Sequence, residues 1–465
     1  MWETPGMTST WLVDLVLSHL LSIVGFVMGA VLIAHLLVQQ RASQSTLAWI
    51  LAIVLIPYAG VPLYLVFGGR KIAGKASQKQ RLYGAPGSSQ RPESGIERML
   101  CALGAPPASA GNRVEILGTG EETYAALLAL IDGARRSIHV STLILAGDEV
   151  GSAVLSRLTA RAREGVEVRL LLDAFFRLRT SRRLLRALRN AGGRFEWFMP
   201  VWHLPFRGHA NLRLHRKIVL ADDREAIVGG MNLAREYMGP TPYPGRWRDL
   251  SARVLGPAVA DIAAVFRADW RFASGESLAA APPGAPEGSA AIQVVGSGPD
   301  VASDRLYDAF LTAVFQARRR LWIATPYFVP DEALSRALVL AARRGVEVRV
   351  LVPARSNHLT ADLAGASYLR QLAEAGGRIS CFTPGMMHAK VILVDDALGI
   401  LGSANLDMRS LFLDYEIALF FSTREEIAGL ESWFASLLPG TRELLPAGRG
   451  RVLVEAVARL LGPVA

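Results

Sequence analysis

Two long runs of apolar residues open the chain. Residues 15–38 and 47–69 contain no Lys, Arg, Asp or Glu. Each run is long enough to cross the roughly 30 Å apolar core of a bilayer as a helix, and uncharged runs of this length are unusual in soluble domains. The pattern predicts a transmembrane hairpin over residues 1–70. A cleaved signal peptide is disfavoured, because residues 1–10 hold no Lys or Arg and the first run is too long.

A different pattern begins near residue 113, where strand-like apolar runs alternate with helical ones, as in α/β domains. This pattern is duplicated. The stretch "EGVEVRLLLD" returns as "RGVEVRVLVP", and "NAGGRFEWFMP" returns as "EAGGRISCFTP". We therefore expect two similar α/β domains. The expected ranges, in chain order, are 71–112 for a basic juxtamembrane linker, 113–275 for the first domain, 276–290 for a linker rich in Pro, Gly and Ala, 291–438 for the second domain, and 439–465 for a C-terminal tail with a helix.

Composition and charge place this chain at a membrane. The 465 residues are 51% hydrophobic, with a formal net charge of +10 and a mean hydropathy of +0.27, which is too apolar for a wholly soluble protein. Only Arg41 is charged between the two apolar runs, whereas a basic cluster follows the second run before any acid. Its members are Arg70, Lys71, Lys75, Lys79, Arg81 and Arg91. By the positive-inside rule the α/β domains are cytoplasmic, and two spans put the N-terminus there too. The cluster also suits anionic lipid headgroups.

The chain has two cysteines, Cys101 and Cys381. They are too few and too far apart in sequence to predict a disulfide framework or a zinc site, and both suit a reducing cytoplasm.

One short motif occurs once in each predicted domain. "HRKIVLADD" begins at His215 and "HAKVILVDD" begins at His388, and a small turn and an Asn follow each. A single match arises by chance about once in several thousand positions, but two matches inside an independent repeat indicate a site. The candidate residues are His215, Lys217, Asp222, Gly230 and Asn232 in the first copy, and His388, Lys390, Asp395, Ser403 and Asn405 in the second.

The chemistry of these residue types points to a phosphate group. On a strand, residues two apart face the same side, so each His and Lys should project into one cleft. The Lys supplies a cation for a phosphate oxygen and disfavours a charge on the imidazole, which keeps the ring available as a nucleophile or base. The small residues Gly230 and Ser403 let a ligand approach the backbone, and Asn232 and Asn405 can donate to phosphate oxygens.

Four acidic residues accompany the motifs. For Asp222 and Asp395 we favour a turn or strand-end role over direct catalysis. A catalytic His needs an acceptor on its other ring nitrogen, and Asp249 and Glu416 occupy comparable places after the two motifs. We expect these two to orient the histidines. The sequence shows no carboxylate or Cys/His cluster, so we expect no metal in the site.

The paired motifs resemble those of the phospholipase D superfamily, and nearly the whole chain resembles bacterial cardiolipin synthases with two N-terminal membrane spans. Further pieces that carry the resemblance are "AWILAIVLIPYAGVPLYLVFGG", "NLRLHRK", "GSGPD", "TPYFVPDE" and "SANLDMRSLFLDYE". The resemblance implies two phospholipase D-like domains, each a mixed sheet flanked by helices, in a pseudo-two-fold arrangement behind the hairpin. One departure is Asp414, where this family pattern has Asn.

The resemblance also implies a reaction. His215 is expected to attack phosphatidylglycerol as the nucleophile, and His388 is expected to act as the acid and base. A phosphatidyl-histidine would form and pass its phosphatidyl group to a second phosphatidylglycerol, giving cardiolipin and glycerol. No cofactor is expected. The implied location is the bacterial inner membrane, as a multi-pass protein with cytoplasmic catalytic domains.

Several alternatives remain open at this point. A membrane-bound phospholipase D that uses water or another alcohol has the same motifs, and phosphatidylethanolamine can replace one donor. A nuclease of the same superfamily fits the basic charge but not the membrane spans, so no nucleic acid is expected. A catalytically inactive membrane scaffold would not need both His and Lys pairs. The oligomeric state is left open. The first domain has an extra loop over 202–213, and its Trp202, Phe206, Arg207 and Arg213 suit either a membrane interface or a covering loop.

Overall fold

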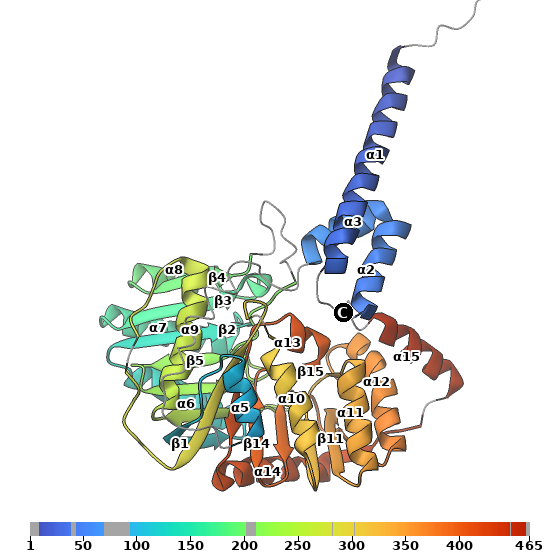
Figure 1. Cartoon of the computed structure of the whole chain (residues 1–465). Helices are drawn as coiled ribbons and strands as arrows, with labels where there is room; N and C mark the ends of the chain where they lie inside the picture. Colours follow the sequence, from blue (N-terminus) through green and yellow to red (C-terminus); the bar gives the residue numbers. More distant parts are fainter. Residues whose placement is uncertain are drawn as a thin grey trace, which may run out of the picture. The chain divides into compact units, whose positions relative to one another are not determined.

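The structure is a computed structural model that describes residues 9–38, 43–68, 94–200, 211–280, 282–301, 303–446 and 448–461. These residues fall into two compact units, a helical N-terminal unit and a larger α/β unit. Each unit is described by itself (Figure 1). The basic cluster expected over residues 70–91 lies outside the described residues.

The N-terminal unit begins with one long helix, α1 (Ser9–Val38). Its stretch Val13–Val38 is the one candidate membrane span in the described part of the chain. At 1.5 Å per residue, 26 residues rise about 39 Å, which exceeds the roughly 30 Å apolar core of a bilayer. The first predicted span is therefore present as a helix of sufficient length.

The second predicted span is not one helix, and the expectation of a two-helix transmembrane hairpin is corrected here. Residues 43–68 form two short helices, α2 (Ser43–Leu55) and α3 (Pro57–Phe67). The break falls at Ile56, whose φ of −135° and ψ of 61° are not helical. Pro57 explains it, because a proline ring disfavours the helical conformation of the residue before it. The absence of charged residues over 47–69 predicts one span, because this criterion does not register the helix break at Pro57.

The α/β unit contains the two expected similar halves. The elements of its first half are β1 (Ser109–Leu117), α6 (Gly120–Gly133), β2 (Ser137–Thr142), α7 (Glu149–Arg163), β3 (Glu167–Asp173), α8 (Arg182–Asn190), β4 (Arg194–Phe198), β5 (Ile218–Ala221), β6 (Glu225–Gly229), β7 (Ser251–Leu255) and α9 (Ala258–Ser274). A short helix, α5 (Gly95–Ala102), precedes them, so part of the stretch expected as a juxtamembrane linker is helical.

The second half repeats the pattern. Its elements are β8 (Ala290–Ser297), α10 (Arg305–Gln316), β9 (Arg320–Ala324), β10 (Phe328–Val329), α11 (Glu332–Arg343), β11 (Glu347–Pro353), α12 (Leu359–Glu374), β12 (Arg378–Phe382), β13 (Val391–Val394), β14 (Leu398–Gly402), β15 (Leu406–Asp407), α13 (Met408–Phe412), β16 (Glu416–Phe421) and α14 (Arg424–Leu437). Strand β17 (Thr441–Glu443) and helix α15 (Arg449–Leu461) follow.

Strand order shows the duplication directly. From one edge the first half runs β4-β3-β2-β5-β6-β7-β1, and from the opposite edge the second half runs β12-β11-β9-β13-β14-β16-β8, with β17 added outside β12. In both halves the three outer strands are parallel and the others antiparallel. Strands β1 and β8 pair antiparallel and join the halves into one sheet. The expected mixed sheets in a pseudo-two-fold arrangement are thus confirmed.

Apolar packing also joins the halves. One core combines residues of both, such as Leu214 and Val228 of the first half with Val391 and Ile417 of the second, whereas each half has a further core of its own. Helices α10, α11 and α12 line one side of the second half (Figure 1). The His and Lys of each motif immediately precede β5 or β13, and both strands contribute to the apolar core that the two halves share.

Candidate active site

The two motifs are held by backbone contacts that cross between the halves. His215 N donates to the carbonyl of Tyr415 at 3.0 Å, and Tyr415 N donates back to Arg213 at 2.9 Å. The second motif repeats this arrangement, since His388 N donates to the carbonyl of Arg248 at 2.7 Å. Each histidine thus lies beside the segment that leads to the other half's acid.

Each imidazole contacts the acid of the opposite half. Nδ1 of His215 lies 2.8 Å from Oε1 of Glu416, and Nδ1 of His388 lies 2.7 Å from Oδ2 of Asp249. All four side chains are buried. The acids predicted to orient the histidines are therefore in place, and the pairing is crossed.

Two small residues lie directly behind these acids. A Cβ on Gly230 would lie 2.4 Å from Oδ1 of Asp249, so only glycine leaves room for the carboxylate. At the matching place in the second half, the Ser403 hydroxyl donates to Glu416 and accepts from Ile417 N at 3.0 Å. Both residues were expected to contact phosphate. Their contacts in this structure are with the acids.

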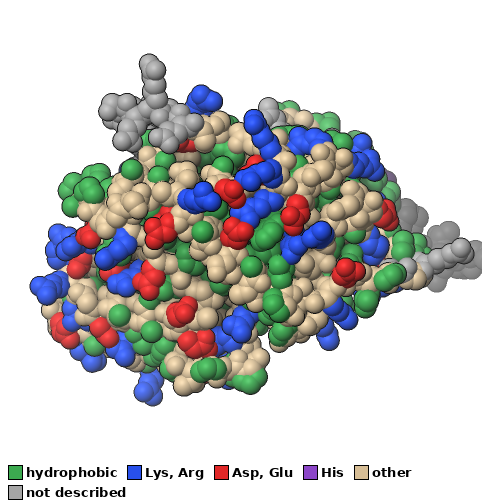
Figure 2. Space-filling view, turned by 90° about the horizontal axis from the view of Figure 1, so that it is seen from below, with side chains coloured by type: hydrophobic (Ala, Val, Ile, Leu, Met, Phe, Trp, Pro, Cys, Tyr) green, Lys and Arg blue, Asp and Glu red, His purple; other side chains and the backbone are tan. Residues whose placement is uncertain are grey.

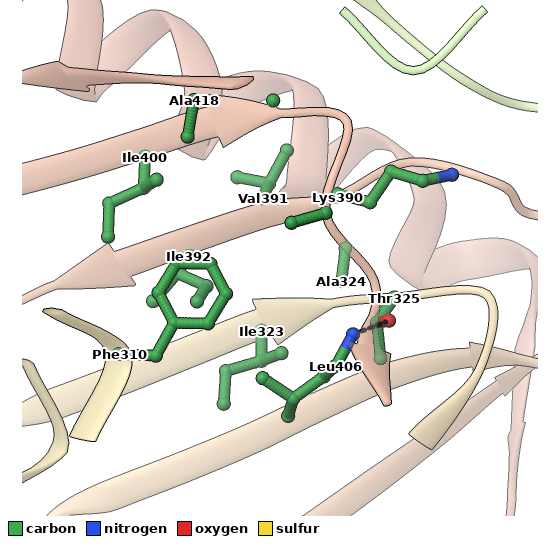
Figure 3. A pocket seen from close by; sticks show the side chains of 12 residues that line it. Phe310, Ile323, Ala324, Thr325, Lys390, Val391, Ile392, Ile400, Leu406 and Ala418 are labelled. Carbon is green, nitrogen blue, oxygen red and sulfur yellow. Dashed lines mark hydrogen bonds between the residues drawn. The ribbon is translucent and has the colours of Figure 1, made fainter. Parts of the chain in front are cut away.

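The two lysines point into the same site. Lys217 Nζ donates to the carbonyl of His215 at 2.5 Å, and Lys390 Nζ lies 3.3 Å from Nε2 of His388. Figure 3 shows the Lys390 side chain extending away from a small apolar pocket that Ile392 and Ile400 help to line. Lys390 immediately precedes β13, so its long side chain reaches the site, whereas Ile392 within the strand packs in the core. That pocket holds about 10 Å³, room for a single water.

Burial shifts the pKa values of the bases and cations downwards. Burial lowers the pKa of His215 to about 4, against the opposing effect of Glu416 and with a further contribution from Lys217. Burial, aided by Lys390 and Lys217, lowers the pKa of His388 well below its ordinary value. Burial also lowers the pKa of Lys217 to about 7 and that of Lys390 to about 8. Because both lysines act on both imidazoles, the two motifs form one site.

The two acids differ in charge. Burial raises the pKa of Asp249 to about 7 in spite of Lys390 and the Leu250 N–H. Burial would also raise the pKa of Glu416, but His215, Lys217 and Ser403 together hold it below its ordinary value. At neutral pH Glu416 is therefore ionised. Asp249, with a pKa of about 7, is protonated in about half of the molecules at that pH.

The two asparagines lie in the same region with different partners. Asn232 is buried, and its Oδ1 accepts from Ile144 N at 3.3 Å. Asn405 is buried, and its side chain hydrogen-bonds Asp407, whereas its Oδ1 has no hydrogen-bond partner among the described residues.

The aspartates of the two motifs lie at strand ends. Asp222 accepts from Arg135 N, Arg136 N and Ser137 N at 2.9, 2.6 and 2.9 Å, and it has a left-handed φ of 56°. Although burial opposes the shift, these donors lower the pKa of its carboxyl group.

Asp395 repeats this arrangement with Arg318 N, Arg319 N and Arg320 N at 3.1, 2.8 and 2.9 Å, and with a φ of 51°. Both aspartates thus tie the end of a motif strand to the start of its neighbour, β2 or β9. Their contacts are those of turn residues.

Sequence reasoning missed two buried ion pairs beside the site. Arg213 is 4% exposed, and its Nη1 lies 3.0 Å from Oδ1 of Asp173, so of the two alternatives left open for the loop the membrane interface does not hold for Arg213. Arg216 donates to both carboxylate oxygens of Asp269 at 2.6 Å and to Ser297 O at 2.9 Å. Strand alternation could have indicated that Arg216 faces away from its two neighbours. Trp202, Phe206 and Arg207 lie outside the described residues.

Among the described residues, aromatic rings contact His388 and not His215. The rings of Tyr237, Trp247 and Tyr327 have centroids 5.1, 5.3 and 6.4 Å from that of His388. Within the described ranges, no aromatic ring contact involves His215, and no group of three or more His, Cys, Asp or Glu is arranged to hold a metal ion. The site is therefore chemically asymmetric in spite of the duplication.

Comparison with known proteins agrees with this geometry. A family model described as cardiolipin synthase, PLD-like domain, matches residues 127–270 and 310–438, which is more than half of the chain. A second model, described as phospholipase D-nuclease N-terminal, matches residues 20–69. A probable cardiolipin synthase of Bacillus subtilis (strain 168) is 33% identical, over 90% of this chain and 87% of its own.

Other relatives extend the match. A cardiolipin synthase A of Pseudomonas syringae pv. syringae (strain B728a) is 34% identical, over 95% of this chain and 98% of its own. The crystal structure of phosphatidylserine synthase from Haemophilus influenzae Rd KW20 has a TM-score of 0.59 at 17% identity, over 80% of this chain and 98% of that one, and so shares the fold. With both halves matched and the relatives covered almost end to end, the chain belongs to the cardiolipin synthase family with phospholipase D-like domains.

Proposed function

We propose that this protein transfers a phosphatidyl group from one phosphatidylglycerol to another, giving cardiolipin and glycerol. The observation that carries the proposal is the crossed pairing of His215 with Glu416 and of His388 with Asp249 in one buried site. Such a site offers one imidazole to attack a phosphorus atom and a second to move a proton at the leaving oxygen. Relatives named cardiolipin synthase support the choice of substrate.

In the first step, Nε2 of His215 attacks the phosphorus of the donor lipid. The P–N bond forms as the P–O bond to the headgroup glycerol breaks. The proton taken up by the glycerol oxygen comes from Nε2 of His388, and the Asp249 proton moves to Nδ1, so the imidazole stays neutral. The product is a phosphatidyl-histidine and free glycerol.

In the second step, Nε2 of His388 removes the proton from the terminal hydroxyl of a second phosphatidylglycerol. That oxygen attacks the phosphorus, the P–N bond breaks and His215 is released as a neutral imidazole. The proton lost to glycerol in the first step is thereby restored to the His388 side, and no water is consumed.

The electrostatics favour this division of roles. Phosphatidylation of His215 places a positive charge on its ring, and the ionised Glu416 at 2.8 Å stabilises that charge. Glycerol needs a proton to leave, and the raised pKa of Asp249, about 7, keeps a proton available on the His388 side. We therefore assign His215 as the nucleophile and His388 as the acid and base.

The remaining site residues have supporting roles in this proposal. Lys217 and Lys390 neutralise the phosphoryl oxygens as charge shifts in the transition state, and Asn232 and Asn405 help to hold the lipid phosphate. Two small residues and two turn residues act through other residues of the site. Gly230 and Ser403 position the two acids, and Asp222 and Asp395 fix the strands that carry the motifs.

The setting of the reaction is a membrane. The N-terminal unit has a helix apolar enough to cross a bilayer, and the named relatives support anionic phospholipids as substrates. The basic cluster over 70–91 supports a cytoplasmic position for the α/β unit at the bacterial inner membrane. A nuclease is less well supported, because Figure 2 shows basic and acidic side chains interspersed on one face, without a track of single sign.

The test is a lipid assay with the purified full chain in neutral mixed micelles. Phosphatidylglycerol labelled separately in its headgroup and acyl chains should give glycerol and cardiolipin in equal amounts. Phosphatidic acid without cardiolipin would establish a hydrolase instead. A second assay adds labelled phosphatidylethanolamine, and release of ethanolamine would extend the donor range to that lipid.

A further inference from the structure

The helices α2 and α3 fold back on each other instead of continuing in one direction. The rings of Trp49 in α2 and Tyr64 in α3 have centroids 5.3 Å apart. In a straight helix these residues would be separated by about 22 Å along the axis, at 1.5 Å per residue. The segment is therefore a tight helical hairpin.

Close packing between the two arms supports this shape. A Cβ on Gly60 would lie 2.1 Å from the carbonyl oxygen of Ala52, so the arms cross at glycine. The turn is stabilised by Gly60 N, which donates to Ile56 O at 2.7 Å. Ile53 and Val61 are buried between the helices. The hairpin is thus built by specific contacts at the break.

The dimensions of the hairpin suit one leaflet of a bilayer. Its arms of 13 and 11 residues rise about 20 and 17 Å, roughly the half-thickness of an apolar core of about 30 Å. The tip is apolar and exposed, since Ile56 is 62% and Tyr58 is 93% accessible. Its outer face exposes Leu51, Val54 and Leu63. Lipid acyl chains are the partner that such a surface fits, because backbone hydrogen bonds are satisfied within the helices.

The distribution of basic residues provides an independent argument. Residues 1–14, before the first apolar run, contain Glu3 and Asp14 and no Lys or Arg, the connection before α2 contains Arg41, and the basic cluster follows α3. If α2 and α3 together crossed the membrane, Arg41 would lie outside, and the start of the chain, which has acidic residues and no Lys or Arg, would lie inside. If the hairpin returns to the side it entered, Arg41 and the whole cluster share the cytoplasmic side, as the positive-inside rule requires.

We infer that α2 and α3 form a re-entrant hairpin embedded in the cytoplasmic leaflet, and that α1 alone crosses the membrane. The start of α1 then faces the extracytoplasmic side, whereas the α/β unit is cytoplasmic. This replaces the expected topology, in which two spans return the chain to the side of its N-terminus. The inference concerns the N-terminal unit and does not depend on the reaction proposed above.

Cysteine labelling distinguishes the two topologies. In a background with Cys101→Ala and Cys381→Ala, single cysteines are introduced at Ser9, Ser43 and Ser94 of the full chain. A membrane-impermeant maleimide is applied to intact spheroplasts and again after permeabilisation. A re-entrant hairpin predicts that Ser9→Cys is labelled from outside, and that Ser43→Cys and Ser94→Cys are labelled only after permeabilisation. The opposite pattern at Ser9 and Ser43 overturns the inference.

A second experiment tests the packing that makes the hairpin. Gly60→Leu removes the close approach to Ala52, so labelling at Ser9 and Ser43 should become mixed between the two sides. Gly25→Leu is the matched control, because a Cβ at Gly25 meets no atom within 4 Å. An unchanged pattern in Gly60→Leu, in membrane-integrated protein recovered at the same level as the control, would contradict the packing argument. This result is readable whether or not the variants synthesise cardiolipin.

Discussion

Nδ1 of His215 lies 2.8 Å from Glu416, a residue 201 positions later and in the other half of the protein. Neither half can therefore assemble a working His–acid pair by itself. We predict that Glu416→Gln slows glycerol release by about 10²–10⁴-fold, because a neutral amide cannot stabilise the cationic phosphatidyl-imidazole. The control is Glu425→Gln on the exposed side of α14, which should retain full activity. Equal activity of both variants would remove Glu416 from the mechanism.

The two histidines should respond differently to a donor with a better leaving group. His215→Ala should abolish product formation from every donor, since no phosphatidyl-enzyme can form. His388→Ala should lose most activity on phosphatidylglycerol, yet it should release an acidic phenol from a phosphatidyl-phenol ester, because that group leaves without a proton. The measurement is release of phenol against glycerol. Rescue of His215→Ala instead would reverse the assigned roles.

The pH dependence of kcat/KM should show a plateau with a falling limb on either side. His215, with a pKa of about 4, loses its nucleophilic neutral form as the pH falls through that value. Lys217 and Lys390, with pKa values of about 7 and 8, lose their positive charge as the pH rises through them, and Asp249 at about 7 loses its proton in the same range.

Activity is thus expected to be constant between about pH 5 and 6.5 and to fall on both sides. Initial rates of glycerol release at low substrate, in neutral mixed micelles, test this. A flat profile up to pH 10 would show that neither lysine loses its charge at the predicted pKa.

Gly230 should be intolerant of even one methyl group. In Gly230→Ala the added carbon would meet Asp249 at 2.4 Å and push its carboxylate away from His388. We expect at least a tenfold loss of transfer with a folded chain, judged by circular dichroism and an unchanged thermal midpoint. Gly385→Ala is the matched control near the same histidine, because a Cβ there meets nothing within 4 Å. Parallel losses in both variants would indicate a general effect of the methyl group.

Asp395 should affect stability more than chemistry. Asp395→Asn weakens an acceptor of three backbone N–H groups, which we expect to lower the free energy of unfolding by about 1–3 kcal/mol. The neighbouring Asp396→Asn removes only ion pairs at the surface, which contribute little to stability, and serves as the control. Urea unfolding measures the free energy of unfolding of both variants. A variant as stable as the control that nonetheless loses turnover would place Asp395 in the chemistry.

The sequence by itself determined the parts of this protein that local patterns encode. Alternating apolar positions specify strands, and a repeated pattern specifies a repeated half, so the two α/β domains and their motif strands were predictable. His215, Lys217, His388 and Lys390 were found because a spacing of two on a strand puts both side chains on one face. The helix α1 was predictable because the length of an uncharged apolar run is by itself enough to indicate a membrane-spanning helix.

Only the tertiary structure decided which elements meet. The crossed pairs join residues 201 and 139 positions apart, and two similar motifs leave no local signal for which acid faces which ring. The sequence left Arg213 open between a membrane interface and a covering loop, and the fold placed it beside Asp173 in the interior. The run over 47–69 was apolar enough to span a bilayer. Hydropathy is summed over residues, however, and does not show where the chain reverses its direction. Pro57 breaks the helix, and Gly60 lets the chain turn back along itself.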